Sequence, residues 1–350
     1  MNKRVTIQDI ADALGISRNT VSKAINNSDG LADGTREKIL QKAVEMGYKQ
    51  FSYVASLSAG AEGSALTGTG ERRYSGEISL LTTTYLAGNH FASLFLDKFH
   101  KEITAVGFTP VTHIISKENL KDLTLPVTFN IEKSHGVICL ELFDLRYSSM
   151  IASLDLPTLF VDGPANPDGA PLATDVLLMD NTTEITRFVN MMLDRGLTKI
   201  GFIGDYLHCR SFYERYSAFR LAMLMNNVPV ESRFLICPED HELDMFREKI
   251  VSLKEMPDVF ICANDFVAID AMQNLASLDR GLLHKVRFLG FDDSHESRIF
   301  YPALSTVHIH TQVMAFSALH LLISRINEPS MDYRVIYSAT DLVLRESTEY

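Results

Sequence analysis

The sequence contains no tryptophan and only four cysteines among its 350 residues. The cysteines are scattered, and no two of them have the Cys-x-x-Cys spacing of zinc ribbons or dithiol redox sites. A disulfide framework is excluded, because such frameworks need paired cysteines in a small secreted domain. We therefore predict buried free thiols, most of them in apolar, strand-like runs, at Cys139, Cys209, Cys237 and Cys262.

Long apolar segments are also absent. No run approaches the roughly 20 residues that a membrane-spanning helix needs. The first residues, Met-Asn-Lys-Arg-Val-Thr, have no apolar stretch behind their charges, so we expect no signal peptide there. We expect a cytoplasmic protein without a membrane partner. A chain of 350 residues, 46% of them hydrophobic, is long enough for two or three compact units.

The short motifs that carry catalytic mechanisms are missing as well. The chain has no Gly-x-Ser-x-Gly elbow, no Gly-x-x-x-x-Gly-Lys-Ser/Thr phosphate loop and no His-Glu-x-x-His. His308 and His310 would share one face of a strand, but a metal site needs three or four convergent ligands. We therefore expect no enzymatic activity, no cofactor and no metal site.

Negative charge dominates the chain but is unevenly divided. The net charge is −11, yet residues 1–57 contain eight basic and six acidic residues and so carry +2. The remainder therefore carries −13. A mildly basic head on an acidic body suits a protein whose head binds DNA while the body is repelled by it. The small charge of one head also favours binding as a dimer.

The N-terminal segment Val5–Ile25, VTIQDIADALGISRNTVSKAI, has the pattern of two short helices separated by a tight break. Thr6 is placed to N-cap the first helix, and Gly15 to end it with a positive φ. Ser17 is placed to cap the second helix. The apolar faces are expected to consist of Ile7, Ile10, Ala11 and Leu14 in the first helix and Val21, Ala24 and Ile25 in the second. This spacing predicts a helix-turn-helix unit.

The polar side chains of the second helix suit DNA. Arg18 presents a donor fork that matches guanine, Asn19 can pair with adenine, and Lys23 lies on the same face. Short hydroxyl and amide side chains suited to phosphate oxygens are found at Thr6, Ser17, Thr20 and Asn26. A third helix is predicted from about Asp33 to Met46, which completes a head over residues 1–49. The alternative is a plain three-helix bundle with solvated polar residues.

These residues also carry a family resemblance. RVTIQDIADALGISRNTVSKAIN, then TREKILQKAVEMGY, then a segment ending in Ala-Ser-Leu57, resemble the lac repressor (LacI/GalR) family of bacterial transcription regulators. The resemblance implies that Arg18, Asn19 and Lys23 lie against bases. It also implies that Leu57 ends a hinge helix and enters the minor groove as a wedge. The chain departs from the family at Gln50 and Phe51, and by a longer linker.

Beyond the head, the composition changes twice. Residues 50–75 read as a hinge helix followed by a Gly-, Ser- and Thr-rich flexible linker. From Gly76 onward, short apolar runs alternate with amphipathic helical stretches, which is the pattern of parallel sheets flanked by helices. The strand-like runs are EISLLTTT, TPVTHII, HGVICLEL, PTLFVD, KIGFIG, DVFICAN and VRFLGFD. We predict an α/β fold in which a three-helix head precedes two doubly wound lobes.

The second half of the body resembles the effector domains of the same family, which are similar to type I periplasmic binding proteins. The matching landmarks include Glu-Arg215-Tyr-Ser-Ala-Phe, Cys-Ala-Asn-Asp265 and Leu-Gly-Phe-Asp-Asp293. We predict an effector-binding and dimerisation domain over residues 76–350. Its first lobe is expected at about 76–162 and 293–325, and its second at about 163–292 and 326–347.

Ligands in such folds lie outside the carboxyl ends of the strands, where the lobes meet. The resemblance implies effector contacts at Phe91, Arg215 and Asp265, which would stack on, donate to and accept from a polar ligand. Each has an alternative: Phe91 as plain core, Arg215 paired with Glu214 or Asp205 on the helix surface, and Asp265 as an N-cap.

These observations predict a homodimeric transcription regulator, most simply a repressor, that binds a pseudo-palindromic double-stranded operator. A small ligand such as a sugar or related metabolite is expected to control it from between the lobes. The alternative is a regulator with a degenerate interlobe site that is gated by a protein partner.

Overall fold

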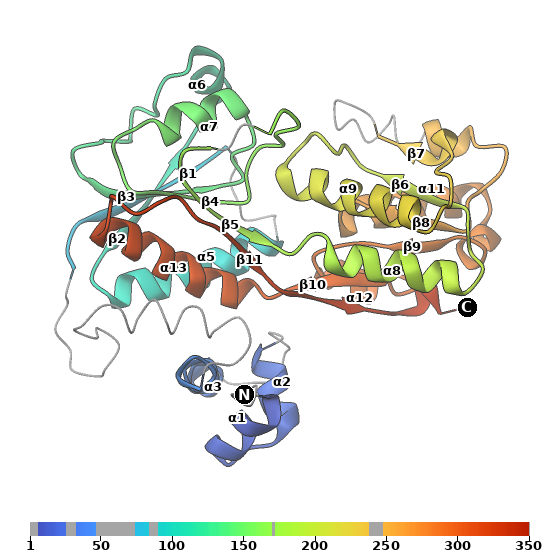
Figure 1. The fold of residues 1–350 in the computed structure, drawn as a ribbon, viewed down its shortest axis with the longest axis horizontal. Helices are drawn as coiled ribbons and strands as arrows, with labels where there is room; N and C mark the ends of the chain where they lie inside the picture. Colours follow the sequence, from blue (N-terminus) through green and yellow to red (C-terminus); the bar gives the residue numbers. More distant parts are fainter. Residues whose placement is uncertain are drawn as a thin grey trace.

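The computed structural model describes residues 6–25, 33–46, 74–83, 90–169, 172–237 and 248–349. Helices α1–α3 form a head beneath a body of two lobes that lie side by side (Figure 1). Of the sequence-based predictions, the hinge, most of the linker, Asn26 and Leu57 lie outside the described residues. No helix of the described residues is long and apolar enough to cross a membrane.

The head contains α1 (Ile7–Leu14), α2 (Arg18–Ile25) and α3 (Asp33–Glu45). Thr6 caps α1 through a capping box with Asp9, and Gly15 ends α1 with a φ of 67°. The predicted helices and caps are therefore confirmed. Among the described residues of the head, the fully buried apolar side chains are Ile10, Ala11, Val21, Ala24, Ile39 and Ala43.

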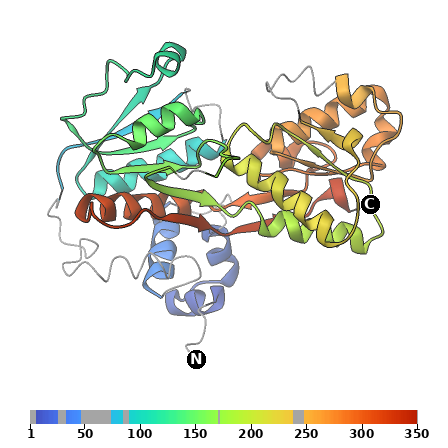
Figure 2. The same cartoon turned by 45° about the horizontal axis from the view of Figure 1, so that its top comes forward.

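The first lobe is built on a six-stranded sheet in the order β11-β5-β4-β3-β1-β2, in which every paired strand is parallel. Its strands are β1 (Glu77–Thr82), β2 (Thr109–Ile114), β3 (Ser134–Leu140), β4 (Thr158–Val161), β5 (Asp175–Met179) and β11 (Val335–Ser338). The flanking helices are α5 (His90–Ala105), α6 (Lys117–Asp122), α7 (Leu145–Ala152) and α13 (Thr311–Asn327). Helix α13 packs beside α5, as the turned view also shows (Figure 2).

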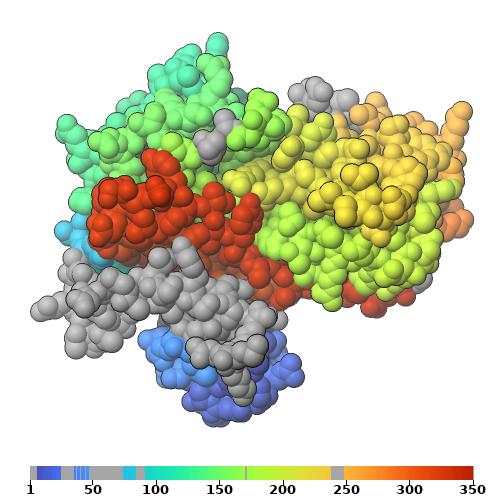
Figure 3. Space-filling model, viewed as in Figure 1, coloured from blue at the N-terminus to red at the C-terminus, as the bar shows by residue number. Residues whose placement is uncertain are grey.

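The second lobe is built on a four-stranded parallel sheet in the order β7-β6-β8-β9. Its strands are β6 (Ile200–Ile203), β7 (Leu235–Ile236), β8 (Val259–Cys262) and β9 (Arg287–Leu289). Its helices are α8 (Thr183–Asp194), α9 (Arg210–Met225), α11 (Asp265–Leu278) and α12 (His295–Ile299). The two lobes meet along a continuous surface in the space-filling view (Figure 3).

The chain passes between the lobes three times. One passage leads from β5 to α8, and the other two run through an antiparallel ribbon of β10 (Thr306–Ile309) and β12 (Thr340–Val343). The predicted lobe boundaries are wrong at these passages. Strands β5 and β11, assigned above to the second lobe, pair with the first sheet, while residues 293–305 pack on the second lobe. Pairing between strands that are distant in the sequence decides which lobe each strand belongs to. The periodicity of apolar residues does not predict such pairing.

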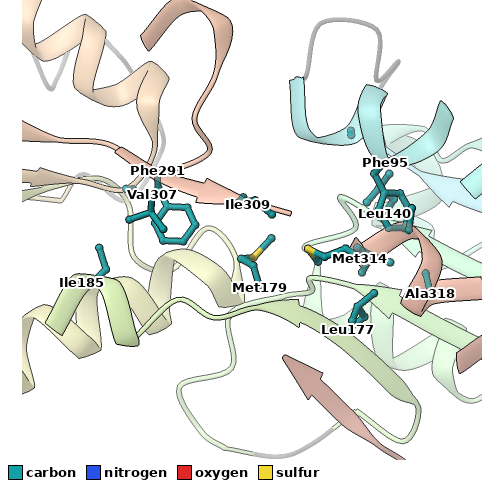
Figure 4. Close-up of a cluster of buried hydrophobic side chains, with 14 of the residues drawn as sticks. Phe95, Leu140, Leu177, Met179, Ile185, Phe291, Val307, Ile309, Met314 and Ala318 are labelled. Carbon is teal, nitrogen blue, oxygen red and sulfur yellow. The ribbon is translucent and has the colours of Figure 1, made fainter. Parts of the chain in front are cut away.

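The apolar core is continuous across the passages. Met179, Ile309 and Met314 lie between the side chains of the two lobes, with Leu177 on one side and Phe291 on the other (Figure 4). A continuous core of this kind resists independent unfolding of either lobe, because burial is lost on both sides at once.

A buried ion pair fixes strand β11 in the first lobe. Asp175, on β5, accepts hydrogen bonds from Arg325 at 2.9 and 3.1 Å and from Arg334 at 2.7 Å. Arg325 is almost fully buried with it, and Arg334 is largely buried. Loss of Asp175 would leave two buried cations without their partner, so this pair is expected to be sensitive to single substitutions.

Candidate DNA-binding helix and interlobe site

Helix α2 presents a polar, exposed face at its N-terminus. Arg18, Asn19 and Lys23 are exposed, whereas Val21 and Ala24 on the opposite face are fully buried in the head. The Ser17 hydroxyl accepts a hydrogen bond from the Thr20 backbone at 3.1 Å, which caps the helix as predicted. The three exposed side chains thus project from a helix whose opposite face is packed in the core of the head.

The predicted phosphate-binding side chains have partners within the head. Ser17 and Thr20 hydroxyls lie 2.7 Å apart, and the Thr6 hydroxyl donates to Asp9 at 2.6 Å. Thr6 and Ser17 are exposed at the beginnings of α1 and α2, where unpaired backbone N–H groups favour anions. Their contacts with DNA remain predictions.

In the body, the carboxyl ends of strands from both lobes meet. Asp162, directly after β4 of the first lobe, accepts hydrogen bonds from the Ser211 hydroxyl at 2.6 Å and the Ser211 backbone at 3.2 Å. The ring of Phe143 meets that of His208 edge-on, with centroids 4.8 Å apart. Burial raises the pKa of Asp162, against the opposing effects of Ser211 and Arg215. These contacts define the interlobe site.

Arg215 lies inside this site. Its side chain is 2% exposed, donates from Nε to Asn181 at 3.0 Å and from Nη1 to the Ala263 carbonyl at 2.6 Å, and covers the ring of Phe291 at 3.5 Å. Its Nη2 atom lies 4.0 Å from Asp292 Oδ1. The alternative of a surface pair with Glu214 or Asp205 is therefore wrong.

Asp265 is buried by partners of its own. It is fully buried and accepts hydrogen bonds from the Thr306 hydroxyl at 2.6 Å and the Ser294 backbone at 2.7 Å. The N-cap of α11 is Asn264, which accepts from Val267, so the alternative of Asp265 as the cap is wrong. Burial raises the pKa of Asp265 to about 6. Its contact with a ligand stays a prediction, because each of its carboxylate oxygens already accepts a hydrogen bond, one from Thr306 on β10 and the other from Ser294.

Asp292 is the carboxylate beside Arg215, and the sequence-based prediction missed it. Its backbone has a φ of 113°, and its side chain is 18% exposed. Burial raises its pKa to about 8; Arg215 lowers the pKa, while Asp265, Glu141 and Asp162 raise it further. The available signal was its place in the sequence Leu-Gly-Phe-Asp-Asp, a short distance after strand β9, which pairs with β8.

The adjacent Asp293 has a different environment. It accepts from Arg298 at 2.8 Å and lies 2.9 Å from His308 Nδ1, and it also binds Arg345. Burial raises the pKa of Asp293, but these three partners outweigh burial, and the pKa falls below its usual range. Asp293 therefore stays ionised and holds its three partners together, whereas Asp292 faces Arg215 in the interlobe site.

Phe91 lies elsewhere in the first lobe. It is half-buried, packs against the main core and stacks on Phe95 with ring centroids 6.0 Å apart. The structure gives it no contact with Arg215 or Asp265 among the described residues, so its role in stacking on a ligand remains a prediction.

Comparison with known proteins agrees with this architecture. The model of bacterial regulatory proteins of the lacI family matches residues 6–50, and that of the periplasmic binding protein-like domain matches residues 189–348. The chain is 27% identical to the HTH-type transcriptional repressor PurR of Mannheimia succiniciproducens, over 98% of both chains. It is 26% identical to the HTH-type transcriptional regulator GalR of Lacticaseibacillus casei, over 98% of this chain and 99% of the relative.

Solved structures show the same fold. The lac repressor dimer bound to operator and an anti-inducer matches with a TM-score of 0.65 and 18% identity, over 99% of both chains. The complex of the transcriptional regulator CelR with cellobiose matches with a TM-score of 0.65 and 20% identity, over 98% of this chain and all of the other. With its head, its two lobes and these relatives along its whole length, the chain belongs to the LacI/GalR family of bacterial transcription regulators.

Proposed function

We propose that this protein is a sequence-specific DNA-binding repressor whose affinity for its operator is set by a small molecule bound between the lobes. The observation that carries the proposal is the exposed face of α2, where Arg18, Asn19 and Lys23 project from a rigid helix-turn-helix. Such side chains read base edges in the major groove. The repressors named among the relatives support the same direction of control.

The head binds its operator as part of a homodimer in this proposal. One recognition helix reads only a few base pairs, and two heads related by a two-fold axis require a pseudo-palindromic site. The lac repressor structure is described as a dimer on its operator, which supports this arrangement. Thr6, Ser17, Thr20 and Asn26 serve as phosphate contacts, and Leu57 serves as the minor-groove wedge.

Arg215 and Asp292 are the proposed effector contacts. The Asp292 carboxyl group can accept from one ligand hydroxyl while the Arg215 guanidinium donates to another, which is how a mostly buried site orients a polar ligand. We place Asp265 behind them, because its oxygens bind Thr306 and Ser294. Phe91 is retained as a contact from the first lobe.

Control follows from the three passages between the lobes. A ligand that contacts both lobes favours one relative arrangement of them, and this arrangement sets the spacing of the heads in the dimer. The effect requires that the ligand bind the two arrangements with different affinity. We do not favour the alternative of a protein-gated site, because Arg215 and Asp292 form a polar pair suited to a small ligand.

Two measurements test the proposal. Selection of operators from random duplexes with the full chain is expected to yield a pseudo-palindrome, and a thermal-shift screen of sugars and nucleosides is expected to find a stabilising ligand. The ligand is then added to the operator complex. An operator without two-fold symmetry, or a ligand that leaves operator affinity unchanged, would contradict the proposal.

A further inference from the structure

Two of the three nitrogens of the Arg215 guanidinium are held by protein groups. Nε donates to the Asn181 amide oxygen at 3.0 Å, and Nη1 donates to the Ala263 carbonyl at 2.6 Å. Nη2 has no hydrogen-bond partner among the described residues, and it lies 4.0 Å from Asp292 Oδ1, beyond hydrogen-bond distance. Because the guanidinium is planar, the acceptors of Nε and Nη1 set the direction of the nitrogen that is left for a ligand.

The orientation of the Asn181 amide depends on Glu214. Asn181 is fully buried and donates from Nδ2 to Glu214 Oε2 at 2.9 Å. An ionised carboxylate only accepts hydrogen bonds, so the amide nitrogen faces Glu214 and the amide oxygen is left for Arg215 Nε. If the amide were reversed, two donors would face each other in a buried position, which is costly. Glu214 therefore fixes the acceptor on which the direction of Arg215 depends.

Glu214 is held in turn by a residue of the other lobe. Its Oε1 atom accepts hydrogen bonds from the Tyr337 hydroxyl at 2.8 Å and from Arg210 Nε at 2.9 Å. Arg210 also donates from Nη2 to the Tyr337 oxygen at 2.9 Å, so the three side chains close a ring of hydrogen bonds. Tyr337 lies on β11 of the first lobe, whereas Arg210 and Glu214 lie on α9 of the second. A chain of hydrogen bonds thus runs from the edge strand of one lobe to Arg215 in the other.

The beginning of α9 also lies against the first lobe at other points. The Arg210 backbone donates to the Gly163 carbonyl at 2.8 Å, and Ser211 donates to Asp162. A rearrangement of the lobes that draws α9 away from the first lobe therefore breaks these bonds and those of Tyr337 together. Glu214 then keeps only the second-lobe part of its network.

On the basis of the effector-sensing function proposed above, we propose that Tyr337 is a positioning residue for the effector. Through Glu214 and Asn181 it holds Arg215 in the direction that leaves Nη2 beside Asp292. An arrangement of the lobes that separates Tyr337 from α9 frees the Asn181 amide and lowers the affinity of Arg215 for a ligand. The effector then favours the arrangement in which its own contact is assembled, and this difference in affinity is what control requires.

Tyr337→Phe tests the proposal in the ligand-free, full-length protein. The change removes the hydroxyl and keeps the ring, and Tyr333→Phe, at an exposed tyrosine four residues earlier, is the matched control. The readout is the Nε–H NMR signal of Arg215, which Arg215→Lys assigns. We expect Tyr337→Phe to shift this signal and to speed its hydrogen exchange with solvent by about tenfold, the factor that corresponds to the loss of one hydrogen bond. Tyr333→Phe should leave both unchanged.

A double substitution tests whether the effect passes through Glu214. Glu214→Gln keeps the size of the side chain but can present an N–H to the Asn181 amide, so we expect it to disturb Arg215 more than Tyr337→Phe does. Tyr337→Phe should then add nothing in the Glu214→Gln background, because both changes break the same chain of hydrogen bonds. Effects that multiply in the double variant would overturn this route. Circular dichroism verifies that each variant is folded.

Binding separates the positioning role from effector sensing itself. The probes are glucose, galactose, ribose and adenosine, and isothermal titration measures the dissociation constant of each probe that stabilises the parent in thermal shift. Tyr337→Phe should weaken binding about five- to tenfold, while Tyr333→Phe preserves it. An unchanged affinity or an unmoved Arg215 signal in Tyr337→Phe overturns the role of Tyr337 and leaves effector sensing intact. If no probe binds, the effector-sensing function is contradicted, whereas the NMR signal still decides whether Tyr337 holds Arg215.

Discussion

Replacement of Asp292 by asparagine is expected to make the protein more stable at neutral and alkaline pH. The carboxyl has a pKa of 3.8 in the unfolded chain and about 8 in the folded protein, where burial is the main cause of the rise. Between these values the unfolded chain releases a proton that the folded protein retains. Folding therefore opposes ionisation, and the free energy of unfolding declines as pH rises through this interval.

The magnitude follows from the width of the interval. Each pH unit between the two pKa values costs about 1.4 kcal/mol, so the two units from about pH 6 to pH 8 cost about 3 kcal/mol. Above the folded pKa the cost stays constant, because both states are then ionised. Asparagine is uncharged at every pH and removes the whole dependence at this position. Local relaxation reduces the effect, and we expect a difference of about 2–3 kcal/mol.

Urea unfolding of the parent and Asp292→Asn proteins at about pH 6 and about pH 8.5 measures this difference directly. Asp293→Asn is the matched control and has the opposite sign. The folded pKa of Asp293 is depressed, so its carboxylate stabilises the protein above the unfolded pKa, and its loss should destabilise the protein at both pH values. If the parent and Asp292→Asn proteins respond equally to pH, Asp292 is not held in an environment that opposes its ionisation.

Three further predictions concern the head, the hinge and the packing around the site. Arg18→Ala and Asn19→Ala should each cost about 1–3 kcal/mol in binding to a selected operator, with relaxed specificity at one base position each; uniform weakening across all sequences would contradict base contacts. Leu57→Ser should reduce operator bending, measured by gel mobility, while leaving the melting temperature of the free protein unchanged. Gly290→Ala should destabilise the protein by about 2 kcal/mol or more in urea unfolding, because its Cβ would lie 2.2 Å from Asp265 Oδ1; a variant as stable as the parent would show that this contact yields easily.

The sequence predicted those elements whose signals are local. The apolar spacing of α1 and α2, the hydroxyl caps at Thr6 and Ser17 and the glycine at position 15 all appear where they were expected. Each depends on interactions within a few residues, which periodicity and capping preferences report well. Each predicted strand-like run likewise matched a strand, including β2 and β9 at the edges of their sheets, whereas β5 in the middle of the first sheet was not among the predicted runs.

The lobe boundaries could not be predicted in this way, because they depend on contacts between residues that are far apart in the sequence. Strand β11 is half exposed at the edge of the first sheet, and it pairs with β5, about 160 residues earlier in the chain. Its place there is fixed by the buried pair of Asp175 with Arg334, which two distant segments share. No window of a single sequence contains both partners, so the assignment needed the structure.

The choice between Asp265 and Asp292 shows the same limit at the level of one side chain. Both residues follow strands, and sequence reasoning selected the one that begins a helix. In the structure the absent side chain at Gly290 leaves space in which Asp265 turns inward and reaches Thr306. The left-handed region of φ places Asp292 on the other side, toward Arg215. Backbone conformation decided which carboxylate met the guanidinium.

Asp265, Asp292 and Asp293 link the interlobe site to the chain segment that contacts the head. Asp265 and Asp293 bind Thr306 and His308 of strand β10, so a ligand that displaces Asp292 acts on the residue next to one of these anchors. Strand β10 leads directly into α13, and Val313 at the start of α13 belongs to the same buried apolar cluster as the core of the head. Asp292, strand β10 and the contact of Val313 with the head therefore follow one another along a single short segment of the chain. Ligand affinity and head position are coupled to the extent that the two arrangements of this segment differ in their contacts with the ligand.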